Sequence, residues 1–589
     1  MHHDGVAIPH MAEPSLELLH IWRYGEPTIT GATLERERMS NQSPSEAAVA
    51  VVGGGPIGLT AFITLRRMGV DAVLVERHAG TAIVPKALQL NERTMEVFRQ
   101  LGLEDDVRAA SLPRDEVGYL YAGASVTAAS YDRFPLVHQS DKTGVLSQLC
   151  SQDALEPVLR AHAERLAPGR VQFGTQLVAL TQDAENVELR LVDAESRAVR
   201  TLKADYLVAA DGSRSTVREL LGIRMDGDAA LQHSMHVVFD APMGPLVEDR
   251  ASAMYYIQGL GAGDVYVDSV MFVIVDGDRR WRLMFDYDPQ ADQDFGEDAL
   301  RALIRKAVGV PDLEVEIRGI FPWEPAALLA ETFRAGRVLL VGDAAHVRPP
   351  WGGLGMNAGI GDAHNLAWKL AEVVAGRAGD ALVDTYEQER RPIAQRTIEA
   401  AIGNNGQGNK VRSPDQAVRV SNNRRRRAEG LVLGYTYTSP AVIPDGTSAP
   451  VVEDEQVDYV PTARPGHRAP HFEVEHGSAI RSITDLFGAD FVLLTGPAGT
   501  VWRDAADSVA ADLATSLRAY VVGGVAGDLG DPLGRWSELY CSTADGAVLV
   551  RPDGHVAWRT TAVPDDPRAA LLAALTSVLG LARSTHQPA

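Results

Sequence analysis

The most constraining feature of the sequence is a glycine motif between a buried strand and a helix. Ala48–Val52 is an unbroken run of small apolar residues, typical of a strand covered on both faces of a parallel sheet. Gly53-x-Gly55-x-x-Gly58 follows directly, and Glu76 stands eighteen positions after the last glycine. A helical pattern and a second apolar strand fill the interval, over Ile57–Met68 and Asp71–Val75. This context predicts a βαβ unit that binds a dinucleotide.

Each residue of the motif has a physical role in that prediction. Gly53 permits the tight turn, Gly55 lets the backbone approach a pyrophosphate, and Gly58 lets the helix pack against the strand. The helix N-terminus offers amide donors and a partial positive charge to the phosphates. Glu76 can accept both ribose hydroxyls and would repel a 2′-phosphate, so the pattern favours FAD or NAD over NADP. Without this context, the glycines would indicate only a structural turn.

Another buried strand, Tyr206–Ala210, ends in the pair Asp211-Gly212, and Arg218 follows on the next predicted helix. An Asp-Gly pair taken alone usually indicates no more than a turn. Next to a dinucleotide site, it can place a carboxylate and a guanidinium at one crevice.

The most specific motif follows the buried strand Val338–Val341. That strand ends at Gly342-Asp343, and a glycine-rich turn then starts a helix near Gly355. A carboxylate at the strand end can bind a polyol chain. Backbone amides at the helix N-terminus can stabilise negative charge on a ring system.

These three motifs, in this order, resemble the FAD-dependent group A aromatic hydroxylases of the p-hydroxybenzoate hydroxylase fold, over about residues 46–410. The segments Pro85–Glu96 and Gln152–Pro157 are similar to the phenol and 2,4-dichlorophenol monooxygenase branch, which includes polyketide hydroxylases. Gly434-Tyr435 and Arg464–His471 extend the resemblance. The tail resembles the thioredoxin-like C-terminal domain of these enzymes but has no C-x-x-C pair, so we expect a structural or oligomer-forming role for it.

The resemblance implies an α/β fold with a Rossmann-like FAD-binding domain, an inserted, mostly antiparallel substrate sheet, and a thioredoxin-like C-terminal domain. The expected divisions are a leader at 1–45, FAD-binding residues at 46–225 that include some sheet segments, the substrate sheet at 226–330, FAD-binding and helical residues at 331–440, a linker at 441–470 and the last domain at 471–589. The local patterns also predict helices over Gln89–Leu101, Asp153–Leu166, Asn357–Val374, Ala506–Ala519 and Arg568–Leu579.

The resemblance also assigns cofactor contacts residue by residue. It places the FAD pyrophosphate at the glycine motif, the adenosine ribose at Glu76, the ribityl chain at Asp343, and the flavin pyrimidine edge at the amides after Leu354. Lys86 stands where many relatives have a mobile arginine. Lysine keeps the positive charge but lacks the planar guanidinium that can form two parallel hydrogen bonds. The implied cofactor-binding residues are Gly53, Gly55, Pro56, Gly58, Glu76, Arg77, Lys86, Arg93, Gln152, Asp211, Gly212, Gly342, Asp343, Pro350, Gly355, Met356 and Asn357.

The chemistry implied by the resemblance is monooxygenation. NADPH or NADH reduces FAD, O2 adds to give a flavin C4a-hydroperoxide in a water-poor cavity, and a phenolic or polyketide aromatic substrate gains a hydroxyl group. The sequence does not separate NADPH from NADH. It also leaves open a Baeyer–Villiger or epoxidising oxygenase on the same scaffold, and a flavin-fold protein that only binds a metabolite. A flavin halogenase is disfavoured because the chain has no Trp-x-Trp-x-Ile-Pro signature.

The substrate-side residues are less clear from the sequence. Pro349 belongs to a turn that would line the substrate side of the ring. Strand alternation lets Arg282 and Met284 share a face that Trp281 and Leu283 cannot share. The catalytic candidates are Pro349, Arg282, Tyr287 and His236, with His233, Tyr255 and Tyr256 as alternatives, and each of the sheet candidates could equally be a packing residue.

Composition limits the partners. The formal charge of −22 argues against sequence-independent nucleic-acid binding and against attraction to anionic membranes. Two distant cysteines, Cys150 and Cys541, make neither a disulfide scaffold nor a cysteine zinc site, and no other metal spacing is present. No apolar run is long enough to span a bilayer and the N-terminus lacks a signal-peptide pattern, so we expect a cytoplasmic protein that binds small molecules.

Overall fold

A computed structural model describes residues 44–83, 86–137, 140–261, 267–276, 278–291, 293, 295–410, 428–525, 527–540 and 543–581, without the side chains of 404–410. Most of the predicted leader lies outside these residues, as do Pro85 and Cys541.

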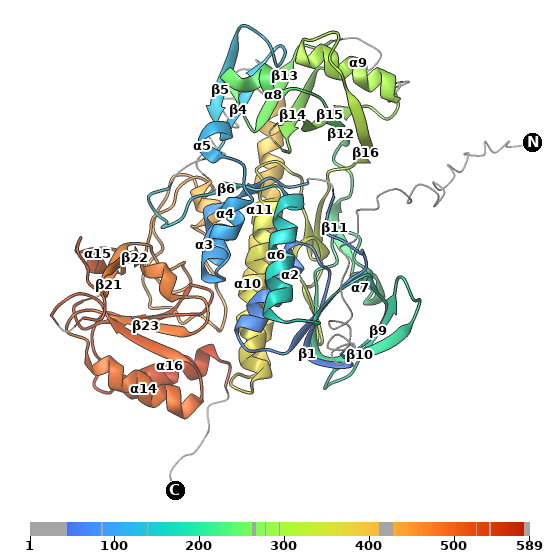
Figure 1. The fold of residues 1–589 in the computed structure, drawn as a ribbon. Coiled ribbons are helices and arrows are strands. Elements are labelled where there is room, and N and C mark those ends of the chain that lie inside the picture. The colour runs from blue at the N-terminus through green and yellow to red at the C-terminus, as the bar shows by residue number, and fades with distance from the viewer. Residues whose placement is uncertain are drawn as a thin grey trace, which may run out of the picture. The chain divides into compact units, whose positions relative to one another are not determined.

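The predicted βαβ unit forms the centre of an eight-stranded sheet (Figure 1). The strand order is β18-β19-β10-β1-β2-β7, with β9 pairing on β10 and β8 on β9. Parallel pairing of β19, β10, β1, β2 and β7 brings the carboxyl ends of these strands to one edge. The strands are β1 (Glu46–Val52), β2 (Ala72–Glu76), β7 (Val171–Phe173), β8 (Thr175–Gln182), β9 (Val187–Asp193), β10 (Val199–Ala209), β18 (Arg334–Ala335) and β19 (Val338–Leu340).

Helices pack on this sheet because the central strands are buried on both faces, as their continuous apolar sequences predict. The helices of this part of the chain are α2 (Pro56–Arg67), α3 (Glu92–Gln100), α4 (Glu104–Ala109), α6 (Gln152–Leu166), α7 (Thr216–Leu220), α10 (Gly355–Val374), α11 (Ala381–Lys410) and α13 (Glu429–Val432), the last of which packs in a separate cluster with Leu354. Two small sheets accompany them, β11 (Met225–Asp228) with β17 (Ala327–Ala330) and β20 (His346–Val347), and β3 (Gln89–Leu90) with β6 (Gln148–Leu149).

The expected helix over Gln89–Leu101 is wrong at its start. Gln89 and Leu90 form β3, and α3 begins only after Asn91. The Asn91 side chain accepts a hydrogen bond from the Thr94 amide at 3.0 Å, which is the usual cap of a helix N-terminus. This capping residue marks the boundary that the apolar period did not show.

The inserted sheet has seven strands in the order β16-β12-β15-β14-β13-β4-β5. As predicted it is mostly antiparallel; the exception is the parallel pair β13 and β4. Helix α9 covers one face with a buried apolar stripe. The elements are α5 (Arg114–Val117), β4 (Tyr119–Gly123), β5 (Tyr131–Pro135), β12 (His233–Asp240), α8 (Gly244–Val247), the 3-10 turn η2 (Glu248–Arg250), β13 (Met254–Gln258), β14 (Ser269–Ile274), β15 (Arg280–Tyr287), α9 (Glu297–Val308) and β16 (Glu316–Trp323). Strands β4 and β5 were not recognised in the sequence: β5 is partly exposed, and β4 joins the sheet by pairing with β13, which is distant in the sequence.

The C-terminal part contains a four-stranded sheet in the order β24-β23-β25-β26, with an apolar cluster on each face. Its elements are β21 (Glu473–His476), β22 (Ala479–Ser482), η4 (Ile483–Leu486), β23 (Phe491–Thr495), α14 (Val501–Leu513), β24 (Leu517–Val521), α15 (Trp536–Tyr540), β25 (Ala547–Val550), β26 (Val556–Thr560) and α16 (Pro567–Val578). The expected helix over Ala506–Ala519 is wrong at both ends. It begins earlier and ends at Leu513, since Ala514 takes a left-handed conformation and the next residues pair with β23.

Among the described residues, no helix is long and apolar enough to cross a membrane, and no group of three or more His, Cys, Asp or Glu side chains could hold a metal ion.

Candidate active site

The glycine turn after β1 leaves no space for a side chain at Gly53 or at Gly58, the first and last glycines of the motif. A Cβ on Gly53, whose φ is +113°, would lie 2.2 Å from the Ala210 carbonyl oxygen. A Cβ on Gly58 would lie 2.0 Å from the Gly53 oxygen. At Gly55 the nearest atom to a Cβ would be Glu156 Oε1 at 3.9 Å, so this glycine has room beside it. This is the arrangement expected where backbone must meet a phosphate at the N-terminus of α2.

The Glu76 carboxylate lies at the end of β2 against that turn. Its Oε2 accepts a hydrogen bond from the Gly54 amide at 2.6 Å, and its Oε1 accepts one from the His78 amide at 2.8 Å. Arg77 is exposed next to it. The carboxylate is therefore held by backbone donors while it remains at the strand edge.

Helix α6 adds a side chain that the sequence did not single out. Gln152 Nε2 donates to Glu156 Oε1 at 2.6 Å, and the Ala82 amide donates to Glu156 Oε2 at 2.6 Å. Burial raises the pKa of Glu156 against the effect of these donors. The spacing of Gln152 and Glu156, one helical turn apart, was the available signal.

The Asp-Gly turn after β10 and the Gly-Asp turn after β19 are joined by an arginine. Asp211 accepts from Ser215 Oγ at 2.6 Å and from the Val217 amide at 3.0 Å, and burial raises its pKa. Arg218 Nη1 donates to the Ala344 carbonyl oxygen at 3.0 Å. The two strand ends thus meet at one crevice, with Gly212 in the first turn and Asp343 exposed in the second.

Behind Asp343 lies a buried charged cluster that the sequence did not single out. The fully buried Asp362 accepts from the Gly342 amide at 3.1 Å and from Arg390 Nε at 2.7 Å, and its Oδ2 lies 2.5 Å from His346 Nε2. Arg348 donates to His346 Nδ1, so the His346 proton is on Nε2. Burial opposes ionisation of Asp362, but His346 and Arg390 hold its pKa well below the usual range. A charged residue in the apolar pattern of α10 was the sequence signal.

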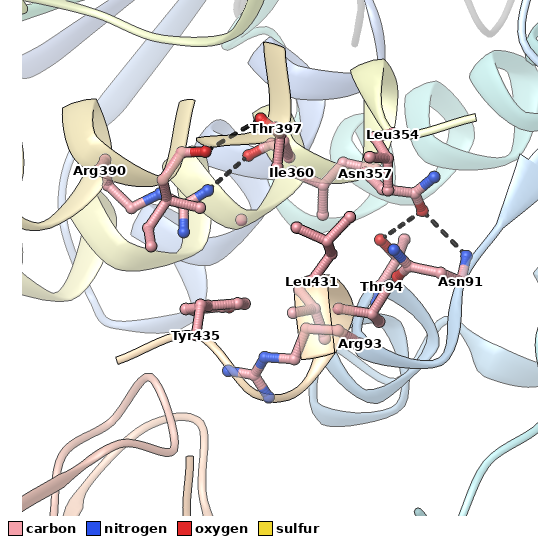
Figure 2. A pocket seen from close by; sticks show the side chains of 15 residues that line it. Asn91, Arg93, Thr94, Leu354, Asn357, Ile360, Arg390, Thr397, Leu431 and Tyr435 are labelled. Carbon is pink, nitrogen blue, oxygen red and sulfur yellow. Dashed lines mark hydrogen bonds between the residues drawn. The ribbon is translucent and has the colours of Figure 1, made fainter. Parts of the chain in front are cut away.

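Helix α10 starts at Gly355, and Asn357 fixes its N-terminus. Asn357 Oδ1 accepts from the Asn91 amide at 2.9 Å and from Thr94 Oγ1 at 2.7 Å, as Figure 2 shows. Its Nδ2 donates to the carbonyl oxygens of Gln89 and Gly353. Both polar atoms of the Asn357 side chain are hydrogen-bonded within the protein. A ligand could therefore bind only the backbone amides of Asn357 and its neighbours.

Arg93 is placed differently from the other predicted cofactor residues. Its guanidinium donates to Glu96 at 3.0 Å and to the Asp553 carbonyl oxygen of the C-terminal part at 2.5 Å. In Figure 2 it points away from Asn357. The structure therefore uses Arg93 in an interdomain contact, and its role toward FAD stays a prediction.

Figure 2 shows a cavity behind the N-terminus of α10, between α3, α11 and α13. It holds about 30 Å³, enough for a few water molecules and far too little for an aromatic substrate. Its lining includes Arg93, Leu354, Ile360, Arg390 and Tyr435.

The inserted sheet presents a mixed face opposite α9. Arg282 and Met284 lie on this face, paired across the strands with Val238 and His236, while Trp281 and Leu283 are buried on the other face as predicted. Arg282 Nη1 donates to the Lys86 carbonyl oxygen at 3.2 Å, so the face turns toward the segment before β3. The neighbouring side chains on this face are Tyr256, Met271, Phe321 and Trp323.

Of the four catalytic candidates, His236 and Arg282 share the mixed face and Tyr287 does not. Burial, and then the charge of Arg282, lower the pKa of His236 to about 4, and its ring lies 5.0 Å from Trp323. Burial also lowers the pKa of Arg282 to about 10. Tyr287 lies on the opposite face, 4.8 Å from the ring of Phe295. Pro349 is buried in the turn before α10, whereas Pro350 is exposed.

Comparison with known proteins places this arrangement in a family. A family model described as "FAD binding domain" matches residues 46–401, and one described as "Aromatic-ring hydroxylase, C-terminal" matches residues 462–582. The chain belongs to the FAD-dependent aromatic hydroxylases. The predicted resemblance and fold class are thus confirmed, and the chain is an aromatic monooxygenase.

The similarity to individual relatives covers nearly the whole length. The tetracenomycin A2 monooxygenase-dioxygenase of Streptomyces glaucescens is 38% identical, over 93% of this chain and 99% of its own. The crystal structure of the flavin-dependent monooxygenase PieE in complex with FAD and substrate has a TM-score of 0.82 at 34% identity, covering 91% of this hydroxylase and 99% of PieE. The ternary complex of aklavinone-11 hydroxylase with FAD and aklavinone has a TM-score of 0.79 at 35% identity, covering 90% and 99%.

The residues at the sheet edge fit FAD. The glycine turn leaves open space beside Gly55, where a pyrophosphate would approach. The carboxylates of Glu76 and Asp343 lie at the ends of β2 and β19, where ribose and ribityl hydroxyls need acceptors. Helices α2 and α10 direct their N-termini toward this edge, which suits the anionic phosphates and an anionic ring.

Glu76→Ala and Asp343→Ala should each purify with less than about a tenth of the wild-type flavin. The reason is that hydrogen bonds to charged groups contribute about 1.5–3 kcal/mol each, and 1.4 kcal/mol is tenfold in affinity. The flavin-to-protein absorbance ratio measures this. Asp298→Ala, which removes a fully exposed carboxylate on α9, is the control and should retain flavin. Full retention in both site variants would overturn the assignment.

Proposed function

We propose that this hydroxylase uses NAD(P)H and O2 to add one oxygen atom to a phenolic ring of a polyketide-type aromatic substrate. The overall reaction consumes a ring C–H, O2, NAD(P)H and a proton, and yields the ring C–OH, water and NAD(P)+. Bound FAD supplies the redox chemistry by taking electrons from the nicotinamide and activating O2.

The observation that carries the substrate proposal is the mixed face of the inserted sheet. The Nε2 atom of His236 is buried on that face without a hydrogen-bond partner among the described residues, and the low pKa keeps the ring neutral. Arg282 lies on the paired strand of the same face. A buried polar atom of this kind needs a partner, and a substrate oxygen would supply one. The surrounding Met and aromatic side chains suit a flat, apolar ring system.

Two similar proteins support a large substrate. Their names refer to tetracenomycin A2 and aklavinone, and the second is bound with FAD in the solved complex. We infer that Arg282 orients a phenolate or carbonyl oxygen of such a substrate and that His236 holds a second oxygen.

The remaining residues would hold the cofactor and exclude water. Pro349 and Pro350 would border the substrate side of the flavin ring, and Lys86 would stand between the cofactor and the mixed face, because its carbonyl oxygen contacts Arg282. Asp211 would serve FAD and the nicotinamide. The other proposed FAD contacts come from Gly53, Gly55, Pro56, Gly58, Glu76, Arg77, Arg93, Gln152, Gly212, Gly342, Asp343, Gly355, Met356 and Asn357.

The test is NADPH and NADH oxidation by the FAD-loaded enzyme with a panel that runs from phenol to hydroxyanthraquinones, under ¹⁸O2. We expect stimulated oxidation with the larger phenols and one ¹⁸O atom in the product. An ester or epoxide product would assign the alternative oxygenase chemistry. Flavin binding without stimulation by any aromatic compound would overturn the proposal.

Arg282→Met should raise KM for an active phenolic substrate about 10- to 100-fold, because a hydrogen bond from a charged group contributes about 1.5–3 kcal/mol. Arg282→Lys should recover only part of this, since lysine lacks the planar fork. Arg280→Met is the matched control: Arg280 lies on the same strand but is half exposed and paired with Asp240. Steady-state kinetics with an unchanged flavin spectrum would separate substrate binding from cofactor loss. Equal KM values for the two methionine variants would contradict the role of Arg282.

A further inference from the structure

The turn between β25 and β26, Arg551–His555, is buried although it is charged. Arg551, Asp553 and His555 are all at most 1% exposed. Loops between strands normally run over the surface, where water satisfies their polar groups. This C-terminal turn instead inserts against α10 and α11, the two long helices next to the flavin site.

The first contact of the turn is with both helices at once. Arg551 donates to the Glu389 carboxylate of α11 at 2.6 and 2.9 Å. Glu389 also accepts from Lys369 Nζ and Asn365 Nδ2 of α10, both at 2.7 Å. Glu389 therefore joins α11 to α10 and both helices to the C-terminal turn. Because its carboxylate is shared with Arg551, the relative position of the two helices depends on the turn.

The second contact passes through an aromatic ring. The His555 ring lies 4.1 Å from the ring of Tyr437, centroid to centroid. The Tyr437 hydroxyl accepts a hydrogen bond from Arg390 Nη1 at 3.0 Å. Arg390 follows Glu389 on α11, so both contacts of the turn converge on the same helical turn.

Arg390 also contacts the N-terminal half of α10, next to the proposed flavin site. Its Nη2 donates to the Ala358 carbonyl oxygen in the first turn of α10 at 3.0 Å, and its Nε donates to Asp362. Asp362 in turn holds the amide of Gly342, directly before Asp343. A continuous chain of contacts thus links the C-terminal turn to the two backbone segments that would hold the ribityl chain and the flavin edge.

We propose that the C-terminal domain positions the flavin site, with Tyr437 as the positioning residue between the Arg551–His555 turn and Arg390. The rigid guanidinium fork of Arg390 transmits the position because its three nitrogens each bind a different group. A purely structural interface would add stability without affecting the geometry of the Gly342 turn. A buried charged network can serve either purpose, so the test must separate them.

The test compares Tyr437→Phe with Tyr435→Phe. Both tyrosines are buried, and they are in ring contact, but only the Tyr437 hydroxyl accepts a hydrogen bond from Arg390. Phenylalanine keeps the ring against His555, so both variants should fold. FAD titration of the apoprotein should show affinity weakened about three- to tenfold in Tyr437→Phe and unchanged in Tyr435→Phe, as expected for one lost hydrogen bond.

A second readout needs no cofactor. Hydrogen exchange of the apoprotein should increase at the amides of residues 342–345 and 355–362 in Tyr437→Phe. His555→Ala, which removes the ring next to Tyr437, should give the same exchange pattern. The effect of the double variant, His555→Ala with Tyr437→Phe, should be smaller than the sum of the two single effects. If Tyr437→Phe had the same FAD affinity and the same exchange rates as Tyr435→Phe, the proposal would be overturned, even if its melting temperature were lower. The turn would then only stabilise the fold. Additive effects of His555→Ala and Tyr437→Phe would overturn it as well.

Discussion

Gly53→Ala should weaken FAD binding by at least about 100-fold. Gly53 has a φ of +113°, which an L side chain rarely adopts, and its Cβ would lie 2.2 Å from the Ala210 carbonyl oxygen. The conformation alone costs about 1–3 kcal/mol, and the contact would force β1 and β10 apart at the edge where we propose that the pyrophosphate binds. Since 1.4 kcal/mol is tenfold, the two effects together reach that loss. The flavin content of the purified protein and FAD titration of the apoprotein measure it.

The matched control is Gly403→Ala. Gly403 lies in α11 with a helical φ, and no heavy atom stands within 4 Å of the Cβ that would be added. Alanine is favoured over glycine in a helix, so this variant should keep its full flavin content. If Gly53→Ala bound FAD as tightly as the control, the glycine turn would not be the pyrophosphate site.

Arg551→Ala should lower the free energy of unfolding by about 3–5 kcal/mol, the usual cost of leaving a buried charge without its partner. The substitution removes the guanidinium that pairs with both Glu389 and Asp553. The side chains of Arg551, Glu389 and Asp553 are almost fully buried. Urea unfolding followed by tryptophan fluorescence is a direct measurement, since the guanidinium lies 5.0 Å from the centre of the Trp368 ring.

Arg568→Ala provides the comparison. Arg568 pairs with Asp512, but both side chains are about half exposed. Exposed pairs contribute at most about 1 kcal/mol, so the urea midpoint should hardly move. A similar small shift for Arg551→Ala would mean that water reaches the Glu389 cluster and that the C-terminal turn does not clamp α10 and α11.

Much of the cofactor side was predictable because it depends on short-range patterns. The glycine spacing demands a tight turn wherever it follows a buried strand, and Gly53 and Gly58 have that environment. Strand alternation likewise predicts that Arg282 and Trp281 lie on opposite faces of the inserted sheet, and they do. The same local reasoning failed for Gln89–Leu90 and Leu517–Ala519, where pairing with β6 and β23 overrides the helical pattern.

The sequence by itself therefore determined the family, the dinucleotide-binding turn and the alternating faces of the strands, because each depends on backbone conformation and residue spacing within a few turns of chain. Only the tertiary structure decided which side chains meet: Arg93 contacts Asp553, Arg551 contacts Glu389, and Asp362 contacts both Gly342 and Arg390. These are contacts across tens to hundreds of residues, and their energies come from excluding water from paired charges, which no local pattern records.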